Sequence, residues 1–321
     1  MSETSITKVP REIWKLIFSF CLKEHLPEYM RVCNSWHMSA KRVFYEEVTI
    51  SDEATGSRFT AALVNYSHGI YVRHLKVHQK EKPRRMSPPL YSRVCIQYIF
   101  RNCYDILTVD LDNCNPYYFL RSLIEVNLDK LKQIKITSSI KTFKSPAVKR
   151  YFLLANQLHR KSIVSLDVPD IPDIVWTKFD ILSKQDYLSQ FIHLEYLTIN
   201  QSMHVFISFT KIVSSLPKLK SLHYISLSRS LGVTDRDILN SSKVKYTNFE
   251  TLSLDVYDLS ANDVEYITSS LPNLKTLSLN VYGLSANDAE YITCSLPNLK
   301  IICTSLEYPK YLRDILVNSV I

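Results

Sequence analysis

The sequence predicts an α/β protein with a small N-terminal helical module, residues 1–50, followed by a βα solenoid, residues 51–321. Three observations lead to this fold class. The C-terminal third repeats itself at an interval of 25 residues, the same apolar spacing recurs upstream, and the N-terminal segment instead has apolar residues at helical spacing. A chain of 321 residues is long enough to bury a continuous core.

The N-terminal module begins with a predicted helix in which Pro10 takes a first helical position, where its fixed φ is favourable. Apolar residues then recur at helical spacing, at Ile13, Leu16, Ile17 and Phe20. We expect a break around residues 25–28, a second helical stretch over 30–40, and a third apolar patch over 43–48 that leads into the repeats. A unit this small needs a partner or the solenoid to cover its apolar surface.

The repeat is clearest near the C-terminus, where residues 251–257 return as 276–282 and residues 260–263 return as 285–288. An interval of 25 residues lies within the range of leucine-rich repeats. The first half of each unit alternates like a strand with one buried face. The second half predicts a helix capped by Ser260 or Ser285, which stops before Pro272 or Pro297.

Degenerate copies of the same spacing extend the series upstream and predict nine strands. They lie within residues 72–77, 106–111, 131–136, 163–168, 194–199, 219–224, 249–254, 274–279 and 299–304. Helices near 90–102 and 147–160 fit the convex side of a horseshoe, whereas 79–89 and 169–173 are predicted loops.

Side chains that alternate with the buried ones should face the concave, solvent side of the solenoid. We expect a protein substrate to bind there, over the middle repeats. The candidate residues are Lys76, Asp110, Lys135, Asp167, Tyr196, Thr198 and His223, and the same row ends at Cys303. For any one of them, a plain solvated surface is the alternative.

Composition excludes several other classes of protein. The chain has only four glycines and no Gly cluster, so phosphate-cradling loops of nucleotide enzymes are not expected. We expect no cofactor, no metal site and no catalysis, because no acid–base pair, nucleophile signature or metal-ligand spacing is present. No long apolar run predicts a membrane span, and seven dispersed cysteines indicate buried, reduced thiols in a cytoplasmic or nuclear protein.

Charge is distributed unevenly along the chain. Residues 1–160 hold 25 Lys+Arg against 14 Asp+Glu, whereas residues 161–321 hold 14 against 17. A basic first half favours an acidic or phosphorylated partner, or a nucleic acid, unless it only solubilises the protein. The basic residues that could contribute are Arg73, Lys76, Lys80, Lys82, Arg84, Arg85 and Arg93.

The N-terminal residues resemble an F-box over about residues 6–48, through Pro10, the Glu12-Ile13 pair, the Ile17-Phe18 pair, Leu26 and the Val32-Cys33-x-x-Trp36 stretch. The whole chain resembles a fungal-style F-box protein with leucine-rich repeats. Val9 and His25 depart from the usual pattern, and His25 replaces a residue that is often acidic.

This resemblance implies a substrate receptor of an SCF-type (cullin–RING) ubiquitin ligase, in which the helices dock on a Skp-type adaptor and through it on a cullin. Pro10, Ile13 and Ile17 would supply the apolar contact to the adaptor. Leu26 and Val32 would complete that surface, and Cys33 and Trp36 would pack within it or against it. The chain would perform no chemistry, and would act by holding substrate lysines near the charged enzyme.

Two other functions remain open. The repeats could form a non-catalytic scaffold that binds a protein without ubiquitin transfer, and the N-terminal helices could be a plain cap of the solenoid. The basic first half could instead bind nucleic acid, in which case binding should depend strongly on salt.

Overall fold

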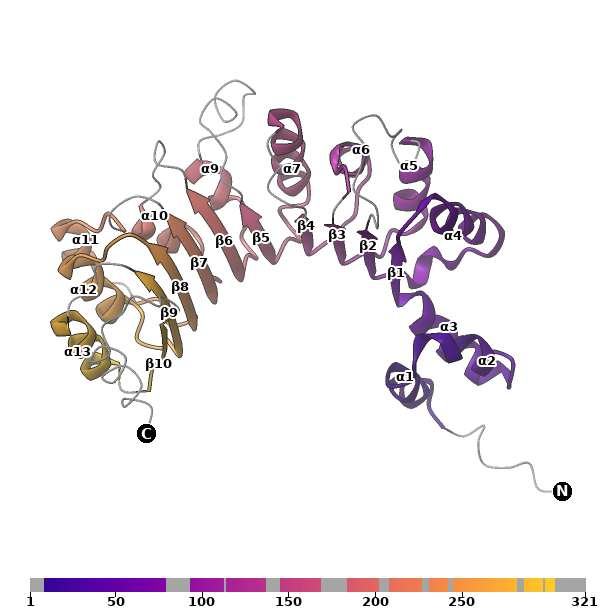
Figure 1. Ribbon diagram of the computed structural model, residues 1–321, viewed down its shortest axis with the longest axis horizontal. Helices are drawn as coiled ribbons and strands as arrows, with labels where there is room; N and C mark the ends of the chain where they lie inside the picture. The colour runs from indigo at the N-terminus through magenta and orange to yellow at the C-terminus, as the bar shows by residue number, and fades with distance from the viewer. Residues whose placement is uncertain are drawn as a thin grey trace. The chain divides into compact units, whose positions relative to one another are not determined.

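The computed structural model describes residues 9–78, 93–112, 114–136, 145–168, 184–201, 208–226, 231–241, 245–281, 286–296 and 298–303 (Figure 1). Its internal contacts divide the chain into two compact units, Met1–His159 and Arg160–Ile321. This division falls inside the predicted solenoid. The boundary between helical module and repeats near residue 50 stays a prediction.

The first unit opens with helices. They are α1 (Arg11–Ser19), η2 (Lys23–His25), α2 (Leu26–Tyr29) and α3 (Asn34–Glu46). The predicted break over 25–28 is wrong, because these residues form the end of η2 and most of α2. The predicted second helix starts later than expected, at Asn34, and it continues to Glu46, so that it absorbs most of the third apolar patch.

Helix α3 runs directly into a four-stranded parallel sheet with strand order β1-β2-β3-β4. The strands are β1 (Glu47–Ile50), β2 (His74–His78), β3 (Thr108–Asp112) and β4 (Gln133–Ile136). Connecting and following segments form α4 (Glu53–Tyr66), η3 (His68–Tyr71), α5 (Arg93–Asn102), α6 (Tyr117–Ile124) and α7 (Pro146–Leu158). Strand β1 was not among the predicted strands, whereas α5 and α7 confirm the helices expected near 90–102 and 147–160.

The second unit contains a six-stranded parallel sheet that runs in chain order from β5 to β10. Its strands are β5 (Ser165–Val168), β6 (Tyr196–Gln201), β7 (Ser221–Ser226), β8 (Thr251–Val256), β9 (Thr276–Val281) and β10 (Lys300–Cys303). Its helices are α9 (Lys184–Ser189), α10 (Phe209–Ser215), α11 (Asp235–Ser241), α12 (Ala261–Ser270) and α13 (Ala286–Ser295).

All nine predicted strands are present, and in each unit the helices lie along one side of the sheet (Figure 1). Burial alternates along the strands, so that Leu252 and Leu254 face the helices while Ser253 between them is part-exposed. The parallel strands, the intervening helices and the alternating burial are those of a leucine-rich-repeat βα solenoid. The α/β fold class predicted from the sequence is confirmed.

Caps define the repeat helices as the sequence predicts. The Ser260 hydroxyl accepts the Asp263 N–H at 3.2 Å and the Asp263 carboxylate accepts the Ser260 N–H at 2.9 Å, which is a capping box. Helix α12 ends at Ser270, before Pro272. The corresponding Ser285 and Pro297, and the predicted loops over 79–89 and 169–173, lie outside the described residues.

The last repeat differs from its prediction by one position. Lys300 pairs with Thr276 and Cys303 pairs with Leu279, an interval of 24 residues between paired positions rather than 25. Cys303 therefore belongs to the row of Leu279, which is buried, and the expectation that Cys303 continues the solvent-facing row is wrong. Ile302 takes that place beside Ser278.

Ion pairs connect neighbouring strands of the second unit at the residues that directly precede them. Lys220 Nζ lies 2.8 Å from Glu195 Oε2, and Lys275 Nζ lies 2.9 Å from Glu250 Oε1. The backbone follows the same ladder, because each of these lysines also donates its N–H to the carbonyl of its glutamate partner. The pairs thus mark equivalent positions in successive repeats.

Cysteine burial is only partly as expected. Cys103 and Cys114 are buried, and burial raises the pKa of each thiol to about 12. Cys33 and Cys294 are exposed, so the expectation that the thiols are buried is wrong for these two. Within the described parts of the chain, no helix has the length and apolar character needed to span a membrane.

Candidate protein-interaction surfaces

The helical module is held together by a small aromatic core. Trp14 and Phe18, one turn apart on α1, pack against Trp36 of α3, with ring centroids 5.0 and 5.5 Å from that of Trp36. Leu26 and Ala40 complete the buried cluster. Four described helical residues at its centre are a limited core, which agrees with the expectation that the module has little apolar interior of its own.

The opposite face of α1 carries apolar side chains that nothing in the first unit covers. Ile13, Ile17 and Phe20 are 46%, 43% and 83% exposed, and Leu16 is exposed between them. Because these positions are separated by three, four and seven residues, they form one stripe along the helix. Helix α1 is therefore apolar on two faces, one in the module core and one in solvent.

Further exposed apolar side chains lie elsewhere in the module. Val32, before α3, is 60% exposed, and Leu22 and Met38 are also exposed. We call Ile13, Leu16, Ile17, Phe20 and Val32 the module surface. The sequence analysis named Leu16 and Phe20 only as helical positions; their spacing relative to Ile13 and Ile17 is the signal that places them with the candidate adaptor contacts.

The remaining candidate adaptor residues occupy different environments. Pro10 is exposed and lies at the N-cap of α1 rather than at its first helical position, and its carbonyl accepts the N–H groups of Ile13 and Trp14. Cys33 is exposed at the N-cap of α3. Leu26 is only 1% exposed and belongs to the core, so it supports the module from within and does not form part of its surface.

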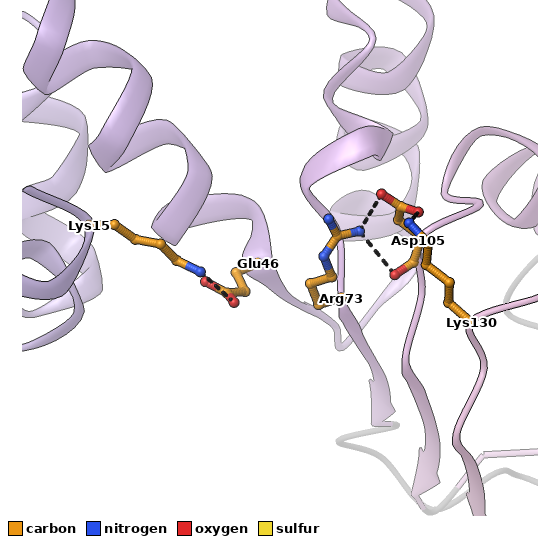
Figure 2. Close-up of polar contacts among 5 residues, drawn as sticks. All are labelled: Lys15, Glu46, Arg73, Asp105 and Lys130. Carbon is orange, nitrogen blue, oxygen red and sulfur yellow. Dashed lines mark hydrogen bonds and ion pairs between the residues drawn. The ribbon is translucent and has the colours of Figure 1, made fainter. Parts of the chain in front are cut away.

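The module is connected to the first repeats by a series of polar contacts (Figure 2). Lys15 of α1 lies 3.1 Å from the Glu46 carboxylate at the end of α3. The Glu46 carbonyl accepts the N–H of Arg73, and the Arg73 guanidinium pairs with Asp105 at 2.6 Å. Asp105 also pairs with Lys130 at 2.6 Å.

These two cations stabilise the charged form of Asp105. Its pKa is lowered, first by the hydrogen bond from Lys130 and then, after the opposing effect of burial, by Arg73. Arg73 therefore has an acidic partner within the protein and is not an open phosphate site. Of the other residues in the basic set, Lys80, Lys82, Arg84 and Arg85 lie outside the described residues, and so does the side chain of Arg93.

The strand face of the first unit brings three of the candidate substrate residues together. Lys76, Asp110 and Lys135 are paired in register across β2, β3 and β4, and all three are at least part-exposed. Adjacent parallel strands are about 4.8 Å apart. The two lysines thus flank Asp110 on one row, and this row presents both signs of charge rather than a purely basic surface.

The two histidines of β2 have partners on β3. The His74 Nδ1 lies 2.8 Å from the Thr108 hydroxyl, and the His78 Nδ1 lies 2.7 Å from the Asp112 carboxylate. Each ring nitrogen named here is therefore engaged in a contact between strands. Among the described residues, no three His, Cys, Asp or Glu side chains group to hold a metal ion.

The strand face of the second unit holds the other candidates. Asp167, Thr198 and His223 are paired in register on β5, β6 and β7, and the row continues through Ser253 and Ser278. Tyr196 lies on the neighbouring row, between Ser165 and Ser221, and is exposed. This face carries mostly hydroxyl groups, in contrast to the charged strand face of the first unit.

Comparisons with known proteins follow from this geometry. No protein-family model and no curated protein sequence matches the chain. Among solved structures, the leucine-rich-repeat-containing protein LegL7 from Legionella pneumophila is similar at 12% identity and a TM-score of 0.39, over 85% of this chain and 97% of that one. The Rad7 and Elc1 complex from yeast is similar at 13% identity and a TM-score of 0.39, over 94% of this chain and 91% of that one. Likenesses at this level say nothing of function, which has to be argued from the module surface and the strand faces.

Proposed function

We propose that this protein is the non-catalytic substrate receptor of an SCF-type ubiquitin ligase. Its helical module docks on a Skp-type adaptor, and its repeats bind a protein substrate on the strand faces. The observation that carries the proposal is the module surface, a stripe of apolar side chains on α1 that the first unit leaves exposed. The resemblance of the same segment to an F-box supplies the kind of partner.

The energetics favour a partner on this surface. Burying an isoleucine, leucine or phenylalanine side chain fully contributes about 1.5–3 kcal/mol. Roughly half of the area of Ile13, Leu16, Ile17 and Phe20 is open to solvent, so covering the four contributes on the order of 3–6 kcal/mol. A small apolar module that presents such a stripe is typical of a protein-interaction site rather than of a terminal cap, whose outer face is polar.

The mechanism requires two binding surfaces on one chain and no reaction by the chain itself. The adaptor on the module surface would bring the ubiquitin-charged enzyme, and the strand faces would hold the substrate. Proximity then raises the effective concentration of substrate lysines at that enzyme. The direct continuation of α3 into β1 supports this role, because it leaves no linker between the module and the first sheet.

Co-expression of the full chain with the adaptor tests the proposal. The wild-type chain should co-purify with the adaptor, and Ile13→Asp with Ile17→Asp should abolish co-purification, since the two charges would be buried in the contact. The matched control is Val64→Asp with Val94→Asp, which places the same charges on exposed apolar residues of α4 and α5. The control should bind as wild type does.

Three outcomes separate the possibilities. Wild-type chain that is folded but fails to bind the adaptor would overturn the proposal. Equal binding by the Ile13/Ile17 variant would show that the module surface is not the interface. Adaptor that co-purifies without a neddylated cullin would support a scaffold in place of a ligase receptor.

A further inference from the structure

A buried histidine lies where the helical module meets the first repeat. His68, the first residue of η3, is only 7% exposed. Its Nδ1 atom is inaccessible to solvent and has no hydrogen-bond partner. Buried polar atoms in folded proteins almost always have a partner, so a lone ring nitrogen at this position needs an explanation.

The surroundings of His68 come from both sides of this junction. Its ring centroid lies 4.4 Å from that of Tyr45, near the end of α3, and 5.2 Å from that of Tyr66, at the end of α4. Lys41 of α3 lies 5.8 Å from the centroid of the Tyr71 ring, on η3 itself. We call Lys41, Tyr45, Tyr66 and His68 the His68 cluster. It connects the last helix of the module to the first repeat.

The backbone around His68 is held tightly in this position. Ser67, directly before it, has a φ of 50°, in the left-handed region that is unfavourable for a residue with a side chain. Gly69, directly after it, packs so closely on the Asn102 carbonyl at the end of α5 that an added Cβ would lie 2.1 Å from the oxygen. His68 therefore has little freedom to move away while η3 stays in place.

We infer that His68 is a pH-sensitive latch: the neutral ring holds α3 against η3, and protonation of the ring releases this contact. The charged and titratable groups around it disfavour the imidazolium. Lys41 and His37 face it from α3 together with the Tyr45 hydroxyl, α4 contributes Tyr66, η3 contributes Tyr71, and α5 meets η3 through the Asn102 backbone. None of these groups is a carboxylate that could pair with a protonated ring.

The direction of the pH effect follows from burial. Burial, then Lys41, lowers the pKa of His68 from its ordinary value of 6.5, against a smaller raising effect of a backbone hydrogen bond with Tyr66. The contribution of the neutral ring is fully present above pH 6.5 and is lost as the pH falls below it, because the released chain binds the proton more readily. At pH 5.5 a released ring with the ordinary pKa is about ten parts in eleven protonated, so the closed form is disfavoured by up to about tenfold.

Hydrogen exchange on the full chain tests the latch, and it does so without the adaptor, so that its outcome is independent of the proposed function. Protection factors of amides in 37–45 and 68–72 should fall by severalfold, up to about tenfold, between pH 7.5 and pH 5.5. His68→Phe, which keeps an aromatic ring between the tyrosines, should remove this pH dependence. The matched control is His25→Phe, which replaces an exposed histidine and should respond as wild type does.

A second measurement keeps the inference testable if the phenylalanine variant does not fold. In wild-type protein, the His68 ring resonance should titrate below the ordinary value and together with the loss of protection at 68–72. Titration of His68 at or above the ordinary value would overturn the latch. So would unchanged protection between the two pH values, or an equal pH response in folded His68→Phe.

Discussion

Replacing Asp263 with alanine should destabilise the second unit by about 4 kcal/mol. Asp263 is fully buried, and its carboxylate accepts three backbone N–H groups. One oxygen receives the N–H of Leu231 at 3.3 Å and of Ser260 at 2.9 Å, and the other receives that of Val233 at 3.2 Å. The side chain therefore caps its own helix and also holds the segment that precedes α11.

The magnitude follows from what alanine would leave behind. Leu231 and Val233 are buried, and each buried N–H left without a partner costs about 1–3 kcal/mol. Loss of the cap interaction at Ser260 adds about 1 kcal/mol, but water can reach this helix end and replace part of it. The sum is close to 4 kcal/mol, which corresponds to a fall in Tm of roughly 8–16 °C for a unit of this size.

Calorimetry and hydrogen exchange on the full chain would measure this loss. The control is Asp235→Ala, which removes an exposed carboxylate that accepts only a side-chain hydrogen bond, from Asn262, and should cost less than about 0.5 kcal/mol. Asp263→Asn, which keeps one acceptor oxygen, should lie between the two. A Tm for Asp263→Ala within 2 °C or so of the control, with protection unchanged at Leu231 and Val233, would refute the reasoning.

Three further predictions concern single positions. Gly69→Ala should lower the free energy of unfolding by about 3 kcal/mol in a denaturant titration, because its Cβ would meet the Asn102 carbonyl; a neutral result would mean that η3 can shift. Ser67→Gly should raise the same free energy by about 0.5–1 kcal/mol by removing the left-handed strain, and a loss would contradict that φ. Cys103 should resist iodoacetamide at pH 8 because burial raises its pKa to about 12, whereas exposed Cys33 should react; equal labelling of folded protein would argue against the burial.

Strand positions were predictable because a repeat imposes the same apolar spacing many times. Strand β1 was missed although Tyr45, Val48 and Ile50 carry that spacing, since an aromatic residue takes the first position. In the last repeat Ile301 and Ile302 are both apolar, so alternation alone could not decide which of them is buried. The structure buries Ile301 and thereby shifts the strand by one residue.

The module surface was only partly predictable, because α1 is apolar nearly all round. Periodicity identifies the helix but does not show which stripe faces inward. The aromatic contacts of Trp14 and Phe18 with Trp36 decide the question and leave Ile13 and Ile17 outside. Leu26 shows the same limit, since an apolar residue in a short helix can complete a surface or support it from below.

The charged row of the first unit required the register of the sheet. Sequence spacing places Lys76, Asp110 and Lys135 at equivalent positions, but only strand pairing shows that the lysines flank the carboxylate. The partner of Arg73 was also out of reach, because Asp105 lies in a turn with no repeating signal. The His68 cluster combines residues from three elements, and no local pattern predicts such a contact.

The near-identity of two successive repeats makes the chain divisible at a defined interval. Removing residues 251–275 would join Glu250 directly to Thr276, and the new neighbour of β7 would again begin Thr-Leu-Ser-Leu. Lys300 would then follow Glu250 at nearly the distance in sequence that Lys275 does now. The contacts that join α1 and α3 to the first strands all lie before residue 131 and would be unaffected. Length in this fold can therefore change by whole units near the C-terminus while the N-terminal attachment stays constant.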